Sequence, residues 1–373
     1  MRTREEQLAD RAAPRVVVAM SGGVDSAVAA WLLKKRGFDV VGVTMQIWPD
    51  VDPTTAVSHG GCCSVAAASD ARRVAAVVGI PFYVLNFQSD FEREVIQDFC
   101  REYARGRTPN PCLVCNSRIK FSLLAGRAQQ LGASYLATGH YARVEHCPQR
   151  GRYLLKKGVD PAKDQSYALY AMTQDQLAHT LFPLGEYTKE QVRRWAAEAG
   201  LPVATKPESQ EICFVVDGDY RAFLRERIPD VARPGPIVDR SGRRLGTHGG
   251  VAGYTVGQRR GLGLPGPEPY YVLEIDAPRN TLVVGTRRET LSGGLLAVDC
   301  NFVSVRRLDR AQTACVKIRY RAPEVPCSLE AAGPGQVAVR FQEPQAAVTP
   351  GQAAVFYQGD EVLGGGTIER PLP

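Results

Sequence analysis

The chain has 373 residues, a formal net charge of +7 and a hydrophobic content of 44%, enough for two or three domains with apolar cores. Its first fourteen residues are charged and lack the apolar segment of a secretory signal, and no apolar run is long enough to span a bilayer. We therefore expect a soluble cytoplasmic protein without membrane association. In that compartment the ten cysteines argue for catalytic, metal-binding or buried thiols rather than a disulfide scaffold.

Strand-like and helix-like segments alternate from Val16 to about Leu201. β-branched runs predict strands at 16–20, 40–45, 81–86 and 135–138, and helical spacing predicts helices at 27–33, 66–78, 91–103 and 121–131. This alternation indicates an α/β fold with a doubly wound parallel sheet, in which ligands bind at the carboxyl ends of the strands. Ser21, Met45 and Gly139 lie at such ends, so we expect them to share one nucleotide site.

The pattern changes after Thr205. Glycine and proline are dense between Val231 and Tyr270, and short alternating runs follow at 314–320, 336–341 and 353–357. These runs indicate a small antiparallel β-barrel or sandwich. We therefore predict a charged N-terminal tail (1–14), an α/β domain (15–205), a central domain (206–281) and a C-terminal β-barrel domain (282–373).

The strongest motif is SGGVDS at 21–26, which stands between the first predicted strand and the first predicted helix. Two glycines allow a tight turn whose N–H groups point at one anion, and the following helix adds its positive end. The Walker pattern is absent, so an ordinary P-loop NTPase is excluded. The segment resembles the signature of the PP-loop ATP pyrophosphatases, which split ATP into AMP and pyrophosphate; the alternative is a purely structural turn.

A second motif, TPNPCLVCN at 108–116, carries Cys112 and Cys115. Two prolines are expected to stiffen a loop that presents both thiols. The pair fits half a zinc site, a redox or nucleophilic pair, or ligands of an iron–sulfur cluster. A closed zinc site is hard to assemble because no second C-x-x-C follows, although Cys62 and Cys63 could supply ligands.

The remaining thiols differ in their surroundings. Cys213 follows the polar residues of SQEICF, which favours an exposed thiol on a loop. For the other five we expect small buried hydrophobic residues; these are Cys100, Cys147, Cys300, Cys315 and Cys327.

Further motifs occur in one order along most of the chain: GCCS (61–64), GRTPNPCLVCNSRIKF (106–121), ATGHYA (137–142), KDQSY (163–167), LFPLG (181–185), SQEICF (209–214), YTVGQRRGLG (254–263) and KIRYR (317–321). Together with SGGVDS they resemble the bacterial-type tRNA-specific 2-thiouridylases. The resemblance implies a PP-loop domain, a small central domain and a C-terminal β-barrel. It also implies the substrate, the wobble uridine of tRNAs for Lys, Glu and Gln.

The resemblance assigns roles to individual residues. It implies that Cys115 is the nucleophile, that Cys213 carries a persulfide, and that Asp25 helps to hold Mg²⁺ beside ATP. A thiolate is needed for attack, so Lys120 and Arg118 are expected to lower a thiol pKa there, unless they bind phosphate or form a solvated helix face. The implied ATP-binding residues are Ala19, Met20, Ser21, Gly22, Gly23, Val24, Asp25, Ser26, Met45 and Gly139. The implied contacts to the target base are Asn110, Pro111 and Cys112, and those to tRNA are Lys163, Asp164, Gln165, Arg319 and Tyr320, the last two on a strand.

Two routes for the sulfur stay open. Adenylation of uracil O2 makes it a good leaving group, and sulfur can then attack C2. In the leading route Cys213 carries the sulfur as a persulfide and a transient Cys115–Cys213 disulfide results. Many family members have Asp where this chain has Cys112, so the alternative is a [4Fe–4S] cluster held by Cys112, Cys115 and Cys213.

Partners and competing functions follow from the same chemistry. The persulfide route requires a sulfur-donor protein, and we expect a monomer that binds tRNA. Within the PP-loop enzymes the competing function is another adenylating transferase, which needs no paired catalytic cysteines. From a different class, the competing function is a non-catalytic ATP-binding or tRNA-binding module, which would leave both thiols without a role.

Overall fold

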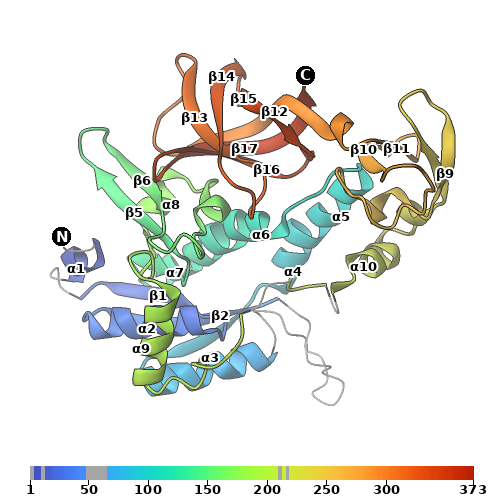
Figure 1. Cartoon of the computed structure of the whole chain (residues 1–373). Helices are drawn as coiled ribbons and strands as arrows, with labels where there is room; N and C mark the ends of the chain where they lie inside the picture. Colours follow the sequence, from blue (N-terminus) through green and yellow to red (C-terminus); the bar gives the residue numbers. More distant parts are fainter. Residues whose placement is uncertain (1–3, 10–12, 48–64, 209–211, 216–217) are drawn as a thin grey trace. The chain divides into compact units, whose positions relative to one another are not determined.

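The computed structural model describes residues 4–9, 13–47, 65–208, 212–215 and 218–373 (Figure 1). The chain divides into two compact units. The first comprises 1–95, 112–216 and 360–362, and the second comprises 96–111, 217–359 and 363–373. None of the helices in the described ranges has the length and apolar character needed to cross a membrane.

A five-stranded sheet forms the centre of the first unit. Its order is β3-β2-β1-β4-β7, and every neighbouring pair is parallel, which confirms the predicted α/β fold. The strands are β1 (Arg15–Ala19), β2 (Asp39–Gln46), β3 (Phe82–Asn86), β4 (Tyr135–Ala137) and β7 (Thr180–Leu181). Because β1 lies between β2 and β4, the chain reverses its direction of travel across the sheet there, and ligands bind at such points.

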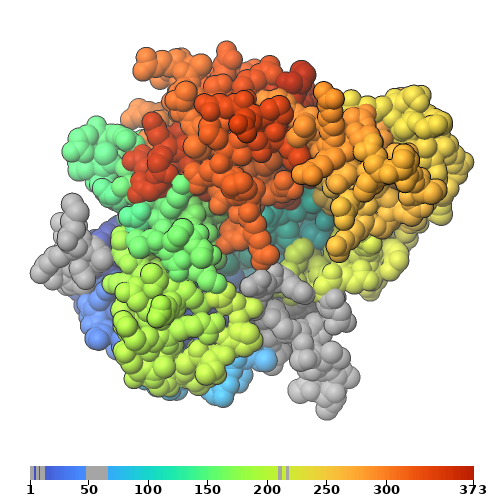
Figure 2. All heavy atoms as spheres, in the orientation of Figure 1, coloured from blue at the N-terminus to red at the C-terminus, as the bar shows by residue number. Residues whose placement is uncertain are grey.

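The apolar runs of the sequence account for the core of this unit. Val16, Val17 and Val18 of β1 are completely buried, as expected for a parallel strand covered on both faces. Around the sheet lie α2 (Val24–Lys35), α3 (Val65–Val78), α7 (Ala125–Gln130) and α9 (Lys189–Glu198). Residues of α9, coloured yellow-green, lie on the face shown in Figure 2.

Other segments of the first unit complete it. Near the N-terminus, α1 (Arg4–Ala9) is held by its Arg4 guanidinium, which donates to the carbonyls of Leu177, Ala178 and Thr180. A hairpin pairs β5 (Ala142–Cys147) with β6 (Arg152–Lys157). The helical segments are α4 (Gln88–Phe91), η1 (Glu92–Ile96), α6 (Pro111–Val114), η2 (Cys115–Leu124), η3 (Ser166–Leu169) and α8 (Gln174–Ala178).

The second unit holds two sheets. The first has the order β10-β11-β8-β9 and contains β8 (Gly235–Val238), β9 (Arg244–His248), β10 (Tyr271–Asp276) and β11 (Thr281–Gly285). The helical segments of the second unit are α5 (Gln97–Ala104), α10 (Tyr220–Arg227), η5 (Pro229–Ala232), η6 (Val251–Gly253) and η7 (Arg288–Thr290).

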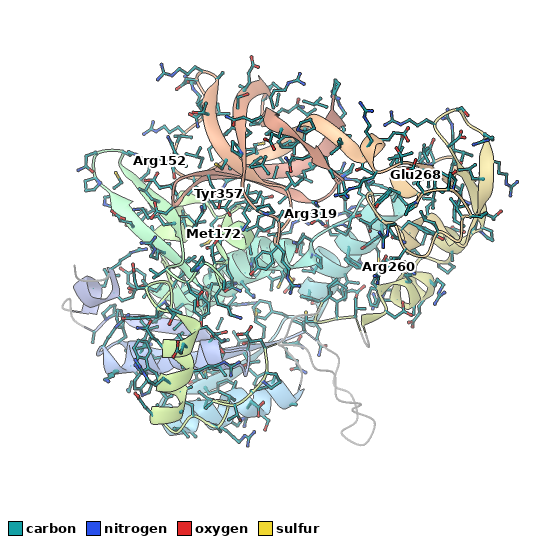
Figure 3. The ribbon with its side chains drawn as sticks, viewed as in Figure 1. Arg152, Met172, Arg260, Glu268, Arg319 and Tyr357 are labelled. Atoms are coloured by element: carbon teal, nitrogen blue, oxygen red, sulfur yellow. The ribbon has the colours of Figure 1, made fainter. Side chains whose placement is uncertain are left out.

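The second sheet closes into the predicted antiparallel barrel. Its strands follow the order β12-β15-β14-β13-β16-β17, and β12 also pairs with β17. They are β12 (Leu291–Phe302), β13 (Gln312–Lys317), β14 (Val325–Gly333), β15 (Gln336–Ala346), β16 (Ala353–Gln358) and β17 (Glu361–Leu372). The interior is filled by side chains, among them Phe356. The next residue of β16, Tyr357, is also buried and is labelled in Figure 3. Closure satisfies the strand edges that an open sheet would expose.

Candidate functional site

The glycine-rich turn joins the end of β1 to the start of α2. Met20 N–H bonds to the Val43 carbonyl of β2 (2.8 Å), and α2 begins at Val24. Within the turn, Ser21 N–H donates to Ser26 Oγ (3.1 Å), which in turn donates to the Gly23 carbonyl (3.2 Å). The turn therefore has a braced shape at the N-terminus of a 12-residue helix, where anions bind.

Two glycines of the site could not carry a side chain. Gly22 has φ +67°, and a Cβ there would lie 2.2 Å from the Ala67 carbonyl oxygen of α3. A Cβ on Gly139 would lie 2.7 Å from the Asp25 carbonyl carbon and the Ser26 nitrogen. Gly139 thus lies against the glycine-rich turn, as predicted from its place after β4. Met45, near the carboxyl end of β2, is 5% exposed.

Asp25 forms the centre of a polar cluster that the sequence did not predict. Its Oδ1 accepts a hydrogen bond from the Tyr141 hydroxyl (2.7 Å), and the Lys189 ammonium lies 2.7 Å from Oδ1 and 2.8 Å from Oδ2. Burial, followed by the charge of Asp25, raises the pKa of Tyr141. Both carboxylate oxygens of Asp25 are already paired with the Lys189 ammonium. In this arrangement Asp25 therefore does not fit the expected role of Mg²⁺ ligand.

Glu208 extends the cluster. Its Oε1 lies 2.7 Å from Lys189 Nζ and its Oε2 lies 2.7 Å from Lys163 Nζ. Burial by itself raises the pKa of Glu208, but hydrogen bonds from Lys163 and Lys189 outweigh it and bring the value to about 2. The carboxylate is therefore charged at neutral pH.

Only weak signals in the sequence point to these residues. Lys189 follows Thr188, and Thr188 with Gln191 forms the capping box of α9, a pattern that indicates only a helix start. Tyr141 lies within ATGHYA, and Glu208 directly precedes SQEICF. Proximity to a quoted motif was the signal that could have identified these two.

A further lysine braces the glycine-rich turn from outside. Lys206 Nζ donates to the Gly22 carbonyl (2.9 Å) and lies 2.6 Å from Asp70 Oδ2 on α3. Burial by itself raises the pKa of Asp70, but the hydrogen bonds from Lys206 and Arg73 outweigh this effect. The pKa of Asp70 is therefore lower than its ordinary value. Lys206 and Glu208, two residues apart, thus tie one short segment to the turn and its cluster.

The prediction of a loop for the two-cysteine motif is wrong. Cys112 lies in α6 and Cys115 begins η2, so both belong to a helical stretch. Pro111 is the first residue of α6, where its missing N–H costs nothing because the first N–H groups of a helix are unpaired. Cys112 is exposed and Cys115 is half-buried, on successive turns of the same helical stretch.

Polar neighbours of Cys115 are engaged with other groups. Asn116 Nδ2 donates to the Ala168 carbonyl (3.0 Å), and Lys120 Nζ donates to Asn116 Oδ1 (3.0 Å). Arg118 lies 3.4 Å from Glu94 Oε2. The expected lowering of a thiol pKa by Lys120 and Arg118 stays a prediction.

Cys213 lies in a turn, in agreement with the predicted loop, but it is half-buried rather than exposed. Val215 N–H bonds to the Ile212 carbonyl (3.1 Å). Phe214, which directly follows Cys213, is 2% exposed. Its ring packs edge-to-face against that of Phe91, with 5.8 Å between the ring centroids. Phe214 thus anchors the turn. Residues 209–211 of the SQEICF motif, and Cys62 and Cys63, lie outside the described residues.

The expected iron–sulfur ligands do not form a metal site in this arrangement. Within the described ranges, no group of three or more His, Cys, Asp or Glu side chains is placed to hold a metal ion. Cys112, Cys115 and Cys213 all belong to these ranges. The iron–sulfur alternative therefore stays a prediction.

The expected tRNA-contact residues have varied environments. Asp164 accepts hydrogen bonds from the N–H groups of Gly158 (3.1 Å) and Ser166 (3.0 Å), and Gln165 Oε1 accepts one from Tyr141 N–H (3.0 Å). Both side chains thus have a structural role in the loop before η3.

Arg319 and Tyr320 do not lie on a strand, contrary to the prediction. Strand β13 ends at Lys317, and Ala322 N–H bonds to the Arg319 carbonyl in a turn (3.1 Å). The proline that follows Ala322 also opposes continuation of the ladder. Both side chains are exposed, Tyr320 to 40%, and Arg319 is labelled in Figure 3.

The other cysteines follow the sequence prediction in part. Cys100 and Cys327 are buried, as expected, whereas Cys147, Cys300 and Cys315 are half-buried. Burial raises the pKa of Cys300 and of Cys327 to about 12. Neither thiol is suited to act as a thiolate near neutral pH.

The parallel sheet with its SGGVDS turn and the closed barrel define an α/β protein of the PP-loop class with a C-terminal β-barrel. Family models match in the same order: the tRNA methyl transferase HUP domain at 14–217, the tRNA methyl transferase PRC-barrel domain at 221–286 and the aminomethyltransferase beta-barrel domain at 292–368. The chain is 54% identical to tRNA-specific 2-thiouridylase MnmA 1 of Thermoanaerobacter sp. (strain X514), over 96% of this chain and 98% of that protein. It is 53% identical to tRNA-specific 2-thiouridylase MnmA of Moorella thermoacetica (strain ATCC 39073 / JCM 9320), over 95% and 99%.

The chain therefore belongs to the tRNA-specific 2-thiouridylase MnmA family. Among solved structures, a 4-thiouridine synthetase in complex with RNA and bound ATP is 20% identical, with a TM-score of 0.35 over 58% of this chain and 51% of that chain.

Proposed function

We propose that this protein catalyses ATP-dependent 2-thiolation of uridine in tRNA. The observation that carries the proposal is the braced turn at the N-terminus of α2, a position suited to an anion, in a chain that belongs to this family. Transfer of sulfur to C2 requires removal of O2, a poor leaving group. Adenylation with ATP supplies the driving force, because AMP then leaves instead of oxide.

We propose that ATP binds along the turn and at the adjoining strand ends. Residues 21–26 cradle the pyrophosphate, with Ala19 and Met20 at the end of β1 beside them. Met45 and Gly139 border the adenosine. Mg²⁺ would enter with the phosphates, since it keeps several waters and binds proteins through few carboxylates; Asp25 becomes a ligand only by releasing Lys189.

We propose the persulfide route for the sulfur. The terminal sulfur of a Cys213 persulfide attacks C2 and expels AMP, which leaves the base joined to Cys213 through a disulfide. The Cys115 thiolate then attacks the Cys213 sulfur. The S–S bond to the base breaks, the base keeps the sulfur as its 2-thio group, and a Cys115–Cys213 disulfide forms. A thiol reductant supplies two electrons to reopen that disulfide, and a sulfur-donor protein restores the persulfide.

The substrate and its contacts extend this proposal. We propose the wobble uridine of tRNAs for Lys, Glu and Gln as the target, with the base held at Asn110, Pro111 and Cys112. Further tRNA contacts are proposed at 163–165 and at Arg319 and Tyr320. The exposed cationic side chain of Arg319 suits a phosphate, and the exposed aromatic side chain of Tyr320 suits a base. We propose that the protein acts as a monomer, with a catalytic domain at 15–205 after the charged segment 1–14, a central domain at 206–281 and the barrel domain at 282–373.

The test separates adenylation from sulfur transfer. Purified protein, tRNA, ATP and a persulfide donor are incubated, and 2-thiouridine and pyrophosphate are both measured. Cys115→Ser should lose 2-thiouridine and keep tRNA-dependent release of pyrophosphate, because adenylation needs no thiol. Cys112→Ser should be mild, since the persulfide route needs no thiol at this position. The matched control is Cys147→Ser, at the end of a hairpin strand, which should keep both activities.

Two results would contradict the proposal. Wild-type protein that releases pyrophosphate equally without tRNA would favour another adenylating enzyme. Protein that binds tRNA without releasing any pyrophosphate would favour a non-catalytic binding module.

A further inference from the structure

The loop 105–110, between α5 and α6, takes backbone partners from a turn of the C-terminal barrel. Thr108 N–H donates to the Pro350 carbonyl (2.9 Å). The side-chain amide of Gln352 donates from Nε2 to the Thr108 carbonyl (2.8 Å) and to the Pro109 carbonyl (3.4 Å). All of these residues belong to the second compact unit. The backbone of the loop is therefore held from outside, by the turn that precedes β16.

This barrel turn is shaped for close approach to the loop. Gly351 has φ +90°, and a Cβ there would lie 2.9 Å from Thr108 N and 3.0 Å from Thr108 O, so the contact requires glycine. Gly351 N–H donates to the Ile368 carbonyl (2.9 Å), and Ile368 N–H donates to the Gln352 carbonyl (2.8 Å). The backbone of Gln352 is thus paired with β17, and its side chain reaches the loop from a fixed position.

The two carbonyls that Gln352 bonds belong to successive peptide units. The first lies in the plane that joins Thr108 to Pro109, and the second lies in the plane that joins Pro109 to Asn110. The ring of Pro109 fixes its φ, so its ψ is the one soft angle between these planes. A donor that holds both carbonyls therefore sets that angle, and with it the position of the Asn110 Cα. The proline at 111 further restricts the conformation of Asn110.

Other contacts hold the same loop nearer to its start. A Cβ on Gly106 would lie 2.8 Å from the Ile275 carbonyl oxygen of β10. The Arg107 guanidinium lies 2.6 Å from Glu369 Oε2 of β17. These contacts remain if Gln352 is replaced, so such a variant keeps the loop attached to the second unit. What it loses is the fixed orientation of the last peptide units before α6.

We propose that Gln352 is a positioning residue for the target base. The inference rests on the proposed function, in which Asn110 and Pro111 hold the uracil. Through the two peptide units that its amide holds, Gln352 sets where Asn110 presents the base. Adenylation requires O2 of the base to approach the α-phosphorus of ATP, so a small displacement slows this step. Binding of tRNA as a whole depends chiefly on phosphate contacts and is little affected.

The first measurement compares Gln352→Glu with wild-type protein in tRNA-dependent release of pyrophosphate. The substitution keeps the shape of the side chain but replaces its donor by a carboxylate oxygen, which repels both carbonyls. We expect kcat to fall about tenfold or more, the scale of a lost hydrogen bond that leaves its acceptors unpaired. The KM and the Kd for tRNA should change by less than about twofold.

The second measurement, amide hydrogen exchange read by mass spectrometry, does not rely on activity. Exchange in the peptide that covers 105–112 should be about fivefold faster in Gln352→Glu than in wild type. Gln352→Ala removes the donor without adding a charge and should change both measurements in the same direction, which keeps the test informative if Gln352→Glu does not fold. The matched control is Gln345→Glu, which adds the same charge on the same barrel. Gln345 Nε2 donates to the Glu343 carbonyl within β15 (2.9 Å), so this variant should behave as wild type.

The outcomes separate this inference from the proposed function. Unchanged exchange at 105–112 in both Gln352 variants would overturn the contact with the loop. Faster exchange with a wild-type kcat, or a loss confined to the Kd for tRNA, would overturn the positioning role. Formation of 2-thiouridine by the wild-type protein is measured in parallel. If thiolation occurs while the Gln352 variants match wild type, only the positioning role fails; if exchange responds to the substitutions but wild-type protein forms no 2-thiouridine, the proposed function fails and Gln352 still holds the loop.

Discussion

Replacement of Gly22 by alanine tests whether the turn is held rigidly against α3. Gly22 has φ +67°, a left-handed conformation that costs alanine about 1–2 kcal/mol. The new Cβ would also lie 2.2 Å from the Ala67 carbonyl oxygen and 2.8 Å from two other backbone atoms of Ala67. Ordinary carbon contacts need about 3.5 Å, so two backbones must separate by more than about 1 Å, at a further cost of about 1–3 kcal/mol.

We therefore expect Gly22→Ala to lower the free energy of unfolding by about 2–5 kcal/mol and to abolish pyrophosphate release. Gly79→Ala is the matched control, because Gly79 has φ +71° but no atom within 4 Å of its added Cβ. It should lose only about 1 kcal/mol and keep ATP cleavage. Urea denaturation measures stability, and a coupled phosphate assay measures pyrophosphate. Equal stability losses in the two variants, with pyrophosphate release intact in Gly22→Ala, would refute the close-packing argument.

Three further predictions concern single side chains. Cys300, whose pKa burial raises to about 12, should resist iodoacetamide at about pH 8, and Cys300→Ser should keep both pyrophosphate release and thiolation; rapid labelling of folded protein would contradict this. Arg319→Ala should flatten the slope of log K against log salt for tRNA binding by about 0.7 to 0.9, and an unchanged slope would remove Arg319 from the interface. The pKa of Glu208 is about 2 in the folded protein, below its ordinary value, so its stabilising contribution is present above about pH 4.5 and is lost as pH falls through about 2. Glu208→Gln should therefore lose less free energy of unfolding than wild type between about pH 5 and pH 2, as urea denaturation at each pH would measure.

The sequence by itself determined the sheet, the turn and the barrel. Continuous β-branched runs such as Val16–Val18 predict buried parallel strands because strand and helix periods are local properties of the chain. The SGGVDS turn was readable for the same reason, since left-handed conformations and close backbone approach require glycine. Alternating short runs predicted an antiparallel barrel or sandwich, although not that β13 would end at Lys317.

Only the tertiary structure decided how the polar groups of the site are paired. Lys189 and Asp25 are 164 residues apart, and no periodicity or motif in the sequence predicts that they form an ion pair. The loop predicted for the two-cysteine motif is wrong because prolines favour both turns and the first turn of a helix. In the structure the motif is helical. Ion pairs between distant elements depend on how the sheet and helices pack, so the link from Asp25 through Lys189 to Glu208 exists only in three dimensions.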